Sequence, residues 1–230
     1  RDRSVSRGLG DVYKRQDDHS RKVLRDVVEY KLTGDIKLLR GCESEPREAW
    51  ENILRPGKEE HYMDLGAYTG DTIAEFIGYA GEWRRITALE PDPVTFAKLE
   101  KNTAGLHDCI LYRLGAYSRY ARLPFAGGAG RGSHLAAGGA MTELDSVDNI
   151  LCGQTVSLIN MDVEGMEAEA IAGMAKTLRR HRPKLLIAGY HRSEDLWRLP
   201  LEVLAIQPEY KVYVRHYPCL PAWDVNFYFV

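Results

Sequence analysis

The sequence has few cysteines, and none stand in the close pairs that bind zinc. The four cysteines are Cys42, Cys109, Cys152 and Cys219, with no C-x-x-C pair and no histidine cluster at zinc spacing. This spacing argues against a structural zinc site. We therefore expect reduced, mostly structural thiols, as in a reducing compartment.

Long apolar runs and a strong excess of one charge are also missing. No run approaches the roughly 18 apolar residues that a membrane helix requires, and no signal-peptide core follows the basic start. The formal net charge is −2, so no overall positive field would hold a nucleic-acid backbone. We expect a cytoplasmic protein that acts on neither membranes nor nucleic acids.

The 230 residues fit one domain with a small helical extension. Residues 1–17 have no helical or strand period, and we expect a disordered or non-native leader. Residues 18–57 are predicted to form an N-terminal helical extension, with Gly34 as a plausible helix stop. The main domain is predicted at 58–230, where the glycine-rich stretch 127–139 is expected to be a surface loop or hairpin tip.

From residue 61 onward, short apolar runs alternate with amphipathic segments, which predicts βα units around a parallel sheet. The expected strands are 61–65, 85–89, 109–114, 156–161, 184–189, 210–216 and 224–230. The expected helices are 18–39, 45–54, 71–79, 93–102, 146–151, 167–180 and 194–205. Because no helix separates the last two strands, we predict an α/β, Rossmann-like fold: a mostly parallel sheet with a C-terminal antiparallel hairpin. This wiring resembles that of class I methyltransferases.

The first strand runs into M-D-L-G-A-Y-T-G-D-T, residues 63–72. Gly66 and Gly70 would lie at the carboxyl end of the strand, where open α/β sheets bind ligands. Their spacing is G-x-x-x-G, whereas a dinucleotide site has G-x-G-x-x-G. Asp64 and Asp71 would be poor neighbours for a pyrophosphate, but they suit a ligand with ammonium and sulfonium charges.

The second motif is L-E-P-D-P, residues 89–93, in which Glu90 ends the second strand. An acid at this position bonds the ribose hydroxyls of an adenosyl ligand. Asp92 and Pro93 suit the start of the following helix. The order and spacing of the two motifs together favour S-adenosylmethionine as the cofactor.

These motifs resemble the FkbM-type methyltransferases over about residues 62–230. Further matching segments are L-G-A-Y-S, E-L-D-S-V, L-I-N-M-D-V-E-G-M-E and R-P-K-L-L-I-A-G-Y-H. The resemblance implies O-methylation of a sugar or small-molecule hydroxyl with S-adenosyl-L-methionine. It implies that Asp64, Gly66, Gly70 and Glu90 bind the cofactor, with Gly115 and Ala116 near the adenine. The other residues that we predict to bind the cofactor are Ala67, Tyr68, Thr69, Asp71, Pro91, Asp92 and Asp162. Asn160 stands where family members usually have lysine, which removes a charge beside the site.

Methyl transfer to a hydroxyl requires alignment and usually removal of a proton. Asp162 and Glu164, two residues apart after the fourth strand, and His191 after the fifth are our candidate catalytic residues. Asp162 could instead hold the cofactor's ammonium group, and Glu164 and Glu167 could be helix N-terminal charges.

Several alternatives remain open at this point. We assign no metal ligands, although the three candidate catalytic side chains could hold Mg²⁺ or Mn²⁺. Asp145 could cap the 146–151 helix. Rival functions are a nicotinamide-dependent oxidoreductase and a non-catalytic adenosyl-binding protein. The partner we expect is a small-molecule or glycan acceptor of unknown identity, and the sequence leaves the oligomeric state open, including a homodimer.

Overall fold

The computed structural model describes residues 16–126, 134–135, 140–218 and 224–230. The chain divides into two compact units, Arg1–Leu54 with Leu185–Val230, and Arg55–Lys184. The predicted boundaries at residues 17 and 57 stay predictions, and residues 1–15 of the predicted leader lie outside the described part. The 55–184 unit contains four parallel strands and a small second sheet, and the other unit contains three antiparallel strands.

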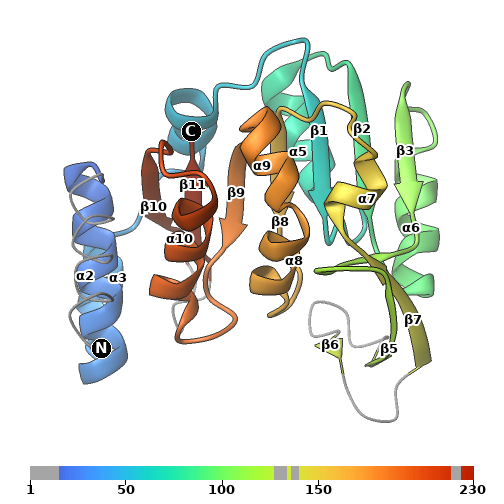
Figure 1. Cartoon of the computed structure of the whole chain (residues 1–230). Helices are drawn as coiled ribbons and strands as arrows, with labels where there is room; N and C mark the ends of the chain where they lie inside the picture. The colour runs from blue at the N-terminus through green and yellow to red at the C-terminus, as the bar shows by residue number, and fades with distance from the viewer. Residues whose placement is uncertain (1–15, 127–133, 136–139, 219–223) are drawn as a thin grey trace. The chain divides into compact units, whose positions relative to one another are not determined.

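Four parallel strands form the sheet of the 55–184 unit (Figure 1). They lie in the order β8-β1-β2-β3, with bounds Leu158–Met161, His61–Leu65, Arg85–Leu89 and Cys109–Tyr112. All residues of β1 and β8 are buried, as expected for strands that are covered on both faces. In register, Asp64 of β1 lies opposite Ala88 of β2 and Asn160 of β8. The segments that follow these strands therefore meet at one edge of the sheet.

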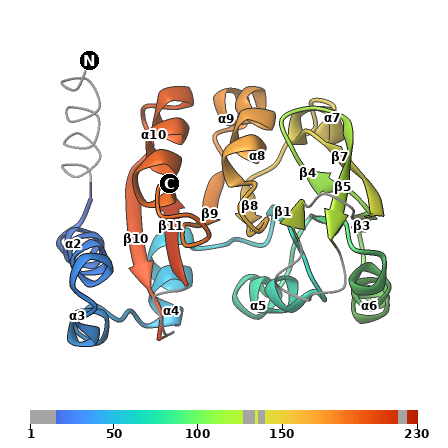
Figure 2. The same cartoon turned by 90° about the horizontal axis from the view of Figure 1, so that it is seen from below.

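Helices cover both faces of these four strands (Figure 2). The bounds of the helices on one face are α5 Asp71–Ala80 and α6 Pro93–Thr103, and those on the other are α8 Glu167–Gly173 and α9 Ala175–His181. The single helix predicted at 167–180 is therefore wrong, because the chain leaves helical geometry at Met174. Gly173, just before the break, packs so closely that an added Cβ would lie 1.9 Å from the carbonyl oxygen of Tyr117.

A second, small sheet was not predicted. Its strands lie in the order β4-β7-β5-β6, with bounds Gly115–Ala116, Ala140–Asp145, Ala121–Ala126 and His134–Leu135. Strands β5 and β7 pair antiparallel, and Arg122 lies opposite Glu143. The loop predicted at 127–139 contains β6, while its other residues lie outside the described part. The predicted third strand ends at Tyr112, two residues early, because the chain moves into β4 of the small sheet.

A short helix, α7 Val147–Leu151, follows the small sheet and is capped by a different residue from the one predicted. The Ser146 hydroxyl accepts a hydrogen bond from the Asn149 N–H at 3.3 Å, so Ser146 is the N-cap. Asp145 lies one residue earlier and accepts from the Ser146 N–H at 2.7 Å. The prediction that Asp145 caps this helix was one residue out.

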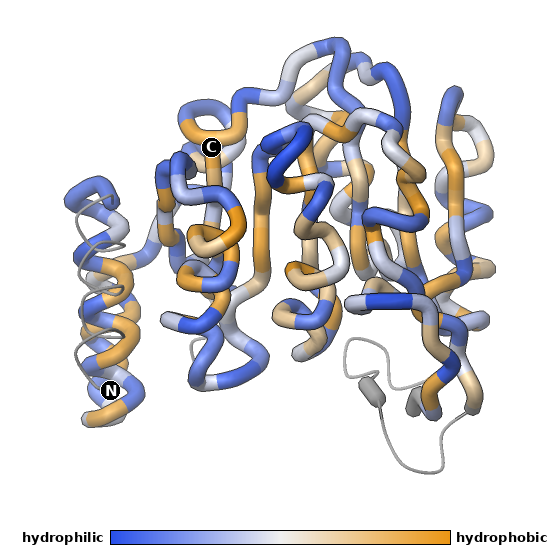
Figure 3. Tube along the Cα trace, in the orientation of Figure 1, coloured by the Kyte–Doolittle hydropathy of each residue, from blue (hydrophilic) through white to orange (hydrophobic). Residues whose placement is uncertain are grey.

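In the other unit, three strands pair antiparallel. Strand β11, Val225–Phe229, pairs antiparallel with β10, Val212–His216, and with β9, Lys184–Ala188. The predicted C-terminal hairpin is thus confirmed. Helix α10, Asp195–Ile206, precedes β10 and contains Pro200. Strand β9 is apolar over most of its length (Figure 3).

The N-terminal helices of this unit are shorter than predicted. Their bounds are α2 Asp18–Thr33, α3 Ile36–Gly41, α4 Pro46–Glu48 and a π-helix at Ala49–Leu54. The helical pattern over 18–39 is divided at Gly34, which adopts a left-handed conformation (φ 74°) and whose N–H bonds to the Tyr30 carbonyl. The predicted stop at Gly34 is confirmed.

Helix α2 packs against β10, where a buried arginine joins them. Arg215 is 2% exposed, and its guanidinium bonds the carboxylates of Glu48 at 2.7 Å and Asp17 at 2.9 Å. It also donates to the Ser20 hydroxyl at 2.8 Å. Two carboxylates and a hydroxyl therefore compensate this buried cation. Among the described residues, no helix is long and apolar enough to cross a membrane.

Candidate active site

The turn after β1 has a shape that two glycines make possible. Gly66 (φ 85°), Tyr68 (φ 48°) and Gly70 (φ 89°) are all left-handed. The N–H groups of Gly66 and Ala67 both donate to the Leu89 carbonyl, at 3.0 and 2.9 Å. A Cβ at position 66 would lie 1.9 Å from the carbonyl oxygen of Asp162, so only glycine fits there.

Helix α5 starts directly from this turn without a side-chain cap. Gly70 is its N-cap residue and has no side chain to accept from the first N–H groups. An uncapped helix N-terminus favours a negatively charged or hydrogen-bond-accepting group. Gly70 also lets α6 approach, because an added Cβ would lie 3.2 Å from Leu99 Cδ1. Gly70 therefore allows close packing against Leu99 and leaves the first N–H groups of α5 without a side-chain cap.

Asp64, just before the turn, is completely buried. Its Oδ2 accepts from the Thr72 hydroxyl at 2.5 Å and the Tyr62 hydroxyl at 3.2 Å, and its Oδ1 accepts from Asn160 Nδ2 at 2.9 Å. Burial raises the pKa of Asp64 to about 6, although these three hydrogen bonds oppose the rise. Sequence reasoning found Asp64 but missed these partners, because the pairing of Asp64 with Asn160 depends on which strand lies beside β1.

Glu90 reaches the same turn from the end of β2. Its Oε2 accepts from the Tyr68 N–H at 3.0 Å and its Oε1 from the Asp92 N–H at 2.8 Å. It is 7% exposed, and burial raises its pKa to about 7. The structure thus brings Asp64, Glu90 and the turn together, as predicted from the motif spacing.

Other residues predicted to bind the cofactor have structural partners at this edge. Asp92 caps α6 as predicted, accepting from the N–H groups of Val94 at 3.1 Å and Thr95 at 2.8 Å. The Thr69 carbonyl accepts from Asn102 Nδ2 at 2.8 Å. Asp71 is the first residue of α5, Pro91 lies between Glu90 and Asp92, and Gly115–Ala116 form β4. A cofactor role for these residues stays a prediction.

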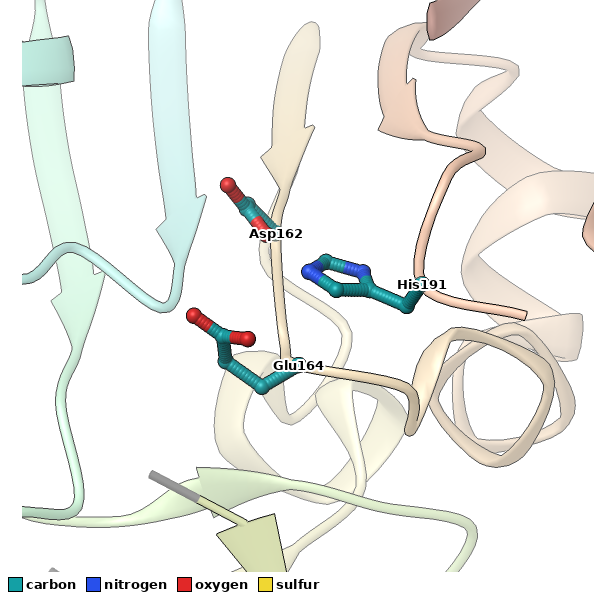
Figure 4. A group of neighbouring side chains, drawn as sticks. All are labelled: Asp162, Glu164 and His191. Carbon is teal, nitrogen blue, oxygen red and sulfur yellow. The ribbon is translucent and has the colours of Figure 1, made fainter. Parts of the chain in front are cut away.

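Asp162 and Glu164 follow β8 at the same edge of the 55–184 unit (Figure 4). The Asp162 N–H donates to the Leu65 carbonyl at 3.0 Å, which extends the ladder between β8 and β1. Glu164 (φ 54°) and Gly165 (φ 91°) are left-handed, so the chain turns sharply before α8.

Glu167 stabilises this sharp turn. It is 1% exposed, and its Oε1 accepts from the N–H groups of Val163 at 3.2 Å and Gly165 at 3.3 Å. The side chain lies in the first turn of α8. This supports the interpretation of Glu167 as a helix N-terminal charge and separates it from Glu164, which precedes the helix.

His191 follows β9 in the other unit, and its ring contacts the Tyr190 ring at a centroid distance of 4.4 Å. Figure 4 draws this histidine with Asp162 and Glu164, because each offers an atom that could bind a metal ion. That His191 acts together with the two carboxylates stays a prediction.

Comparisons with known proteins identify the family and the fold of this chain. Residues 64–213 match the model of the methyltransferase FkbM domain. The structure is similar to that of methyltransferase FkbM from Methylobacillus flagellatus KT, with a TM-score of 0.84 and 27% identity. That match covers 97% of this chain and 58% of the other, so this chain spans little more than half of that protein. No match was found among curated proteins.

Two more distant structures share the fold alone. Aeropyrum pernix fibrillarin, solved with natively bound S-adenosyl-L-methionine, has a TM-score of 0.51 at 13% identity, over 80% of this chain and 71% of that one. An rRNA methylase from Streptococcus thermophilus has a TM-score of 0.52 at 14% identity, over 81% and 96%. The predicted Rossmann-like class I methyltransferase fold is confirmed.

Proposed function

Because this chain belongs to the methyltransferase FkbM family, we propose that it transfers the methyl group of S-adenosylmethionine to a hydroxyl group of a sugar or small molecule. The observation that carries the proposal is the left-handed turn from Gly66 to Gly70, which lies between the buried carboxylates of Asp64 and Glu90. No pyrophosphate-binding spacing is present in this turn, which disfavours the nicotinamide alternative.

The residues of the turn fit the three polar parts of the cofactor. Glu90 would accept from the ribose hydroxyls. The uncapped start of α5 would favour the cofactor's carboxylate. Gly66 allows the turn to pack directly against the Asp162 carbonyl, which fixes the position of the turn. The sulfonium group supplies the activated methyl, and the acidic surroundings suit its positive charge.

For the acceptor, we propose that His191 takes the hydroxyl proton and that Asp162 or Glu164 orients the acceptor or the histidine. Asp162 and Glu164 follow β8 at the edge that carries the turn. Imidazole is the side chain best suited to accept a proton near neutral pH. In-line transfer then needs only that the acceptor oxygen be held against the methyl carbon.

A second use of the same three side chains is metal binding. Two carboxylates and one imidazole are ligands that Mg²⁺ or Mn²⁺ accepts. A bound cation would lower the pKa of the acceptor hydroxyl, so that no histidine base would be required. Methyl transfer measured with and without a chelator, followed by addition of each metal, separates the two mechanisms.

Calorimetry tests the cofactor proposal first. We expect S-adenosylmethionine and its demethylated product to bind, and NAD to give no heat. Labelled S-adenosylmethionine is then offered with a panel of sugars and small hydroxyl compounds, and label transfer identifies the acceptor class. Binding of NAD without binding of S-adenosylmethionine would overturn the proposal. Binding of the cofactor with transfer only to amines or nucleic acid would overturn the hydroxyl acceptor.

A further inference from the structure

The four polar side chains of the Asp64 network, namely Tyr62, Asp64, Thr72 and Asn160, come from three elements. Asp64 and Tyr62 lie on β1, Thr72 lies in the first turn of α5, and Asn160 lies on β8. The turn that would hold the cofactor is the segment between Asp64 and Thr72. A hydrogen bond from Thr72 to Asp64 therefore joins the two ends of that turn directly.

The bond to Asn160 extends this connection to the neighbouring strand. Asn160 lies opposite Asp64 in the parallel register, and its Nδ2 donates to Asp64 Oδ1 at 2.9 Å. Two residues later, the carbonyl of Asp162 occupies the space where a Cβ of residue 66 would be. The end of β8 and the start of the turn are thus packed backbone against backbone. A shift of Asn160 would move both.

Two members of the network are buried, which limits how a lost partner can be replaced. Asp64 is 0% exposed and Asn160 is 5% exposed, so water does not replace a missing bond easily. The three donors use both carboxylate oxygens. The Tyr62 ring is held as well, because it stacks on Phe76 of α5 with a centroid distance of 4.2 Å.

We propose that Asn160 and Thr72 are positioning residues for cofactor binding, which act through Asp64 to fix the turn between β1 and α5. This inference rests on the proposed function, because it assumes that the turn binds S-adenosylmethionine. Neither residue needs to contact the cofactor. Their effect should appear in cofactor affinity, with turnover at saturating cofactor nearly retained.

Position 160 allows a test by loss and rescue. Asn160→Asp would remove the amide donor and place two carboxyl groups face to face, so that one of them must bind a proton before it can donate. Adding Asp64→Asn to that variant restores a donor, because the amide of residue 64 can donate to the new carboxylate while its oxygen still accepts from Thr72 and Tyr62. We expect Asn160→Asp to weaken S-adenosylmethionine binding by about ten-fold and the double variant to regain most of it.

Position 72 gives a second variant in a partly exposed place, where the protein should tolerate the change. Thr72→Ala removes the hydroxyl that reaches Asp64, whereas Thr72→Ser keeps it. We expect weaker cofactor binding for Thr72→Ala and affinity near that of the wild type for Thr72→Ser.

The matched control is Thr87→Ala, which removes another buried bond between neighbouring strands. Thr87 Oγ1 lies 3.1 Å from His61 Nε2, at the opposite end of β1 from Asp64. This variant should lose stability without losing cofactor affinity.

The experiment is calorimetric titration of each full-length variant with S-adenosylmethionine, together with its melting temperature. If Asn160→Asp and Thr72→Ala melt earlier but bind the cofactor as tightly as the wild type, the positioning role is overturned. Failure of the double variant to recover affinity would also overturn it. If the wild type itself binds no S-adenosylmethionine, the proposed function falls, and this inference falls with it.

Discussion

The two ends of strand β1 both carry buried acidic groups, but the groups are held in opposite ways. At the amino end, Glu60 accepts from the Lys184 ammonium at 2.5 Å, from the Ser157 hydroxyl and from the Gly57 N–H at 3.1 Å. Burial raises the pKa of Glu60, but these bonds outweigh it and lower the pKa below its usual value. The carboxylate is stable in its charged form.

At the carboxyl end, Asp64 and Glu90 are held by hydroxyl, amide and backbone N–H donors instead of a cation. Burial therefore dominates and raises their pKa values to about 6 and about 7. Carboxyl groups that are costly to keep ionised are typical of functional sites. The amino end thus favours an ionised carboxylate, whereas the carboxyl end holds carboxyl groups that resist ionisation, as we expect if this end binds the cofactor.

The largest effect should come from His191, the histidine that follows β9. His191→Ala is expected to lower turnover by roughly 10²–10⁴-fold, as for a lost general base, with cofactor affinity unchanged. In the wild type, activity should fall on acidification, because a protonated ring accepts no proton. Steady-state kinetics over a range of pH measures both.

His61, the first residue of β1, provides the control for this prediction. His61 is buried and its ring bonds Thr87, so His61→Gln should lower stability and leave turnover intact. Full activity in His191→Ala with an unchanged pH profile would remove His191 from the mechanism and favour a carboxylate or a metal ion.

Two glycine substitutions should differ in their effect on cofactor binding, because one glycine lies in the turn after β1 and the other lies at the end of α5. Gly66→Ala combines a left-handed backbone with a contact of 1.9 Å to the Asp162 carbonyl. Gly81→Ala is equally left-handed (φ 73°) but meets nothing within 4 Å. We expect Gly81→Ala to cost about 1–2 kcal/mol of stability and to bind the cofactor normally.

Gly66→Ala should abolish measurable cofactor binding, because Asp162 or the turn must move. Calorimetry and thermal unfolding on both glycine variants test this. Equal losses in the two variants would mean that backbone strain alone explains the effect and that the close approach to Asp162 does not matter.

At the amino end, Glu60→Gln should affect stability alone. The change leaves the Lys184 ammonium without its carboxylate, and breaking such a partly buried pair costs about 1–3 kcal/mol. Because the pKa of Glu60 is lowered in the folded protein, its contribution is present near neutral pH and is lost as the pH falls through that pKa. Chemical denaturation at pH 7.5 should show the full difference from the wild type, and this difference should shrink only as the pH falls below the usual pKa of a glutamate and through the lowered pKa of Glu60. A change in cofactor affinity would break the contrast between the two ends.

The strands from β1 to β3 and from β8 to β11 were predicted well, because each is marked by a short run of apolar residues in its own segment of the sequence. The predicted bounds of each of these seven strands agree with the observed bounds within two residues at either end. Asp92 was correctly predicted to cap α6, since a cap needs only its own next three residues. Period and capping motifs are readable without knowing which elements pack together.

What the sequence did not predict depends on contacts between distant residues. The small sheet joins β4 to β7 across about thirty residues, and the break at Met174 follows a contact of Gly173 with Tyr117. The bond between Asn160 and Asp64 requires knowledge that β8 lies beside β1. The role of Asn160 was therefore considered only as a missing charge, whereas in the structure it is a hydrogen-bond donor.

The smallest expected effect concerns the pH dependence of cofactor binding at Glu90. With a pKa of about 7 in the folded protein, Glu90 is partly protonated at neutral pH. The ribose hydroxyls donate hydrogen bonds, so they should prefer the ionised carboxylate. We therefore expect S-adenosylmethionine affinity to rise by about ten-fold between pH 6 and pH 8. The stability of the cofactor-free protein should change in the opposite direction. A carboxyl group with a raised pKa binds more protons in the folded protein, so the folded protein loses stability as the pH rises toward 7.

Glu90→Gln should reduce the pH dependence of both cofactor affinity and stability, whereas Glu60→Gln should leave both unchanged over this range. Calorimetry at pH 6, 7 and 8, compared between the two variants, cancels the titration of the cofactor itself. An unchanged slope in Glu90→Gln would show that Glu90 remains ionised throughout and that the two ends of β1 differ less than their hydrogen bonds indicate.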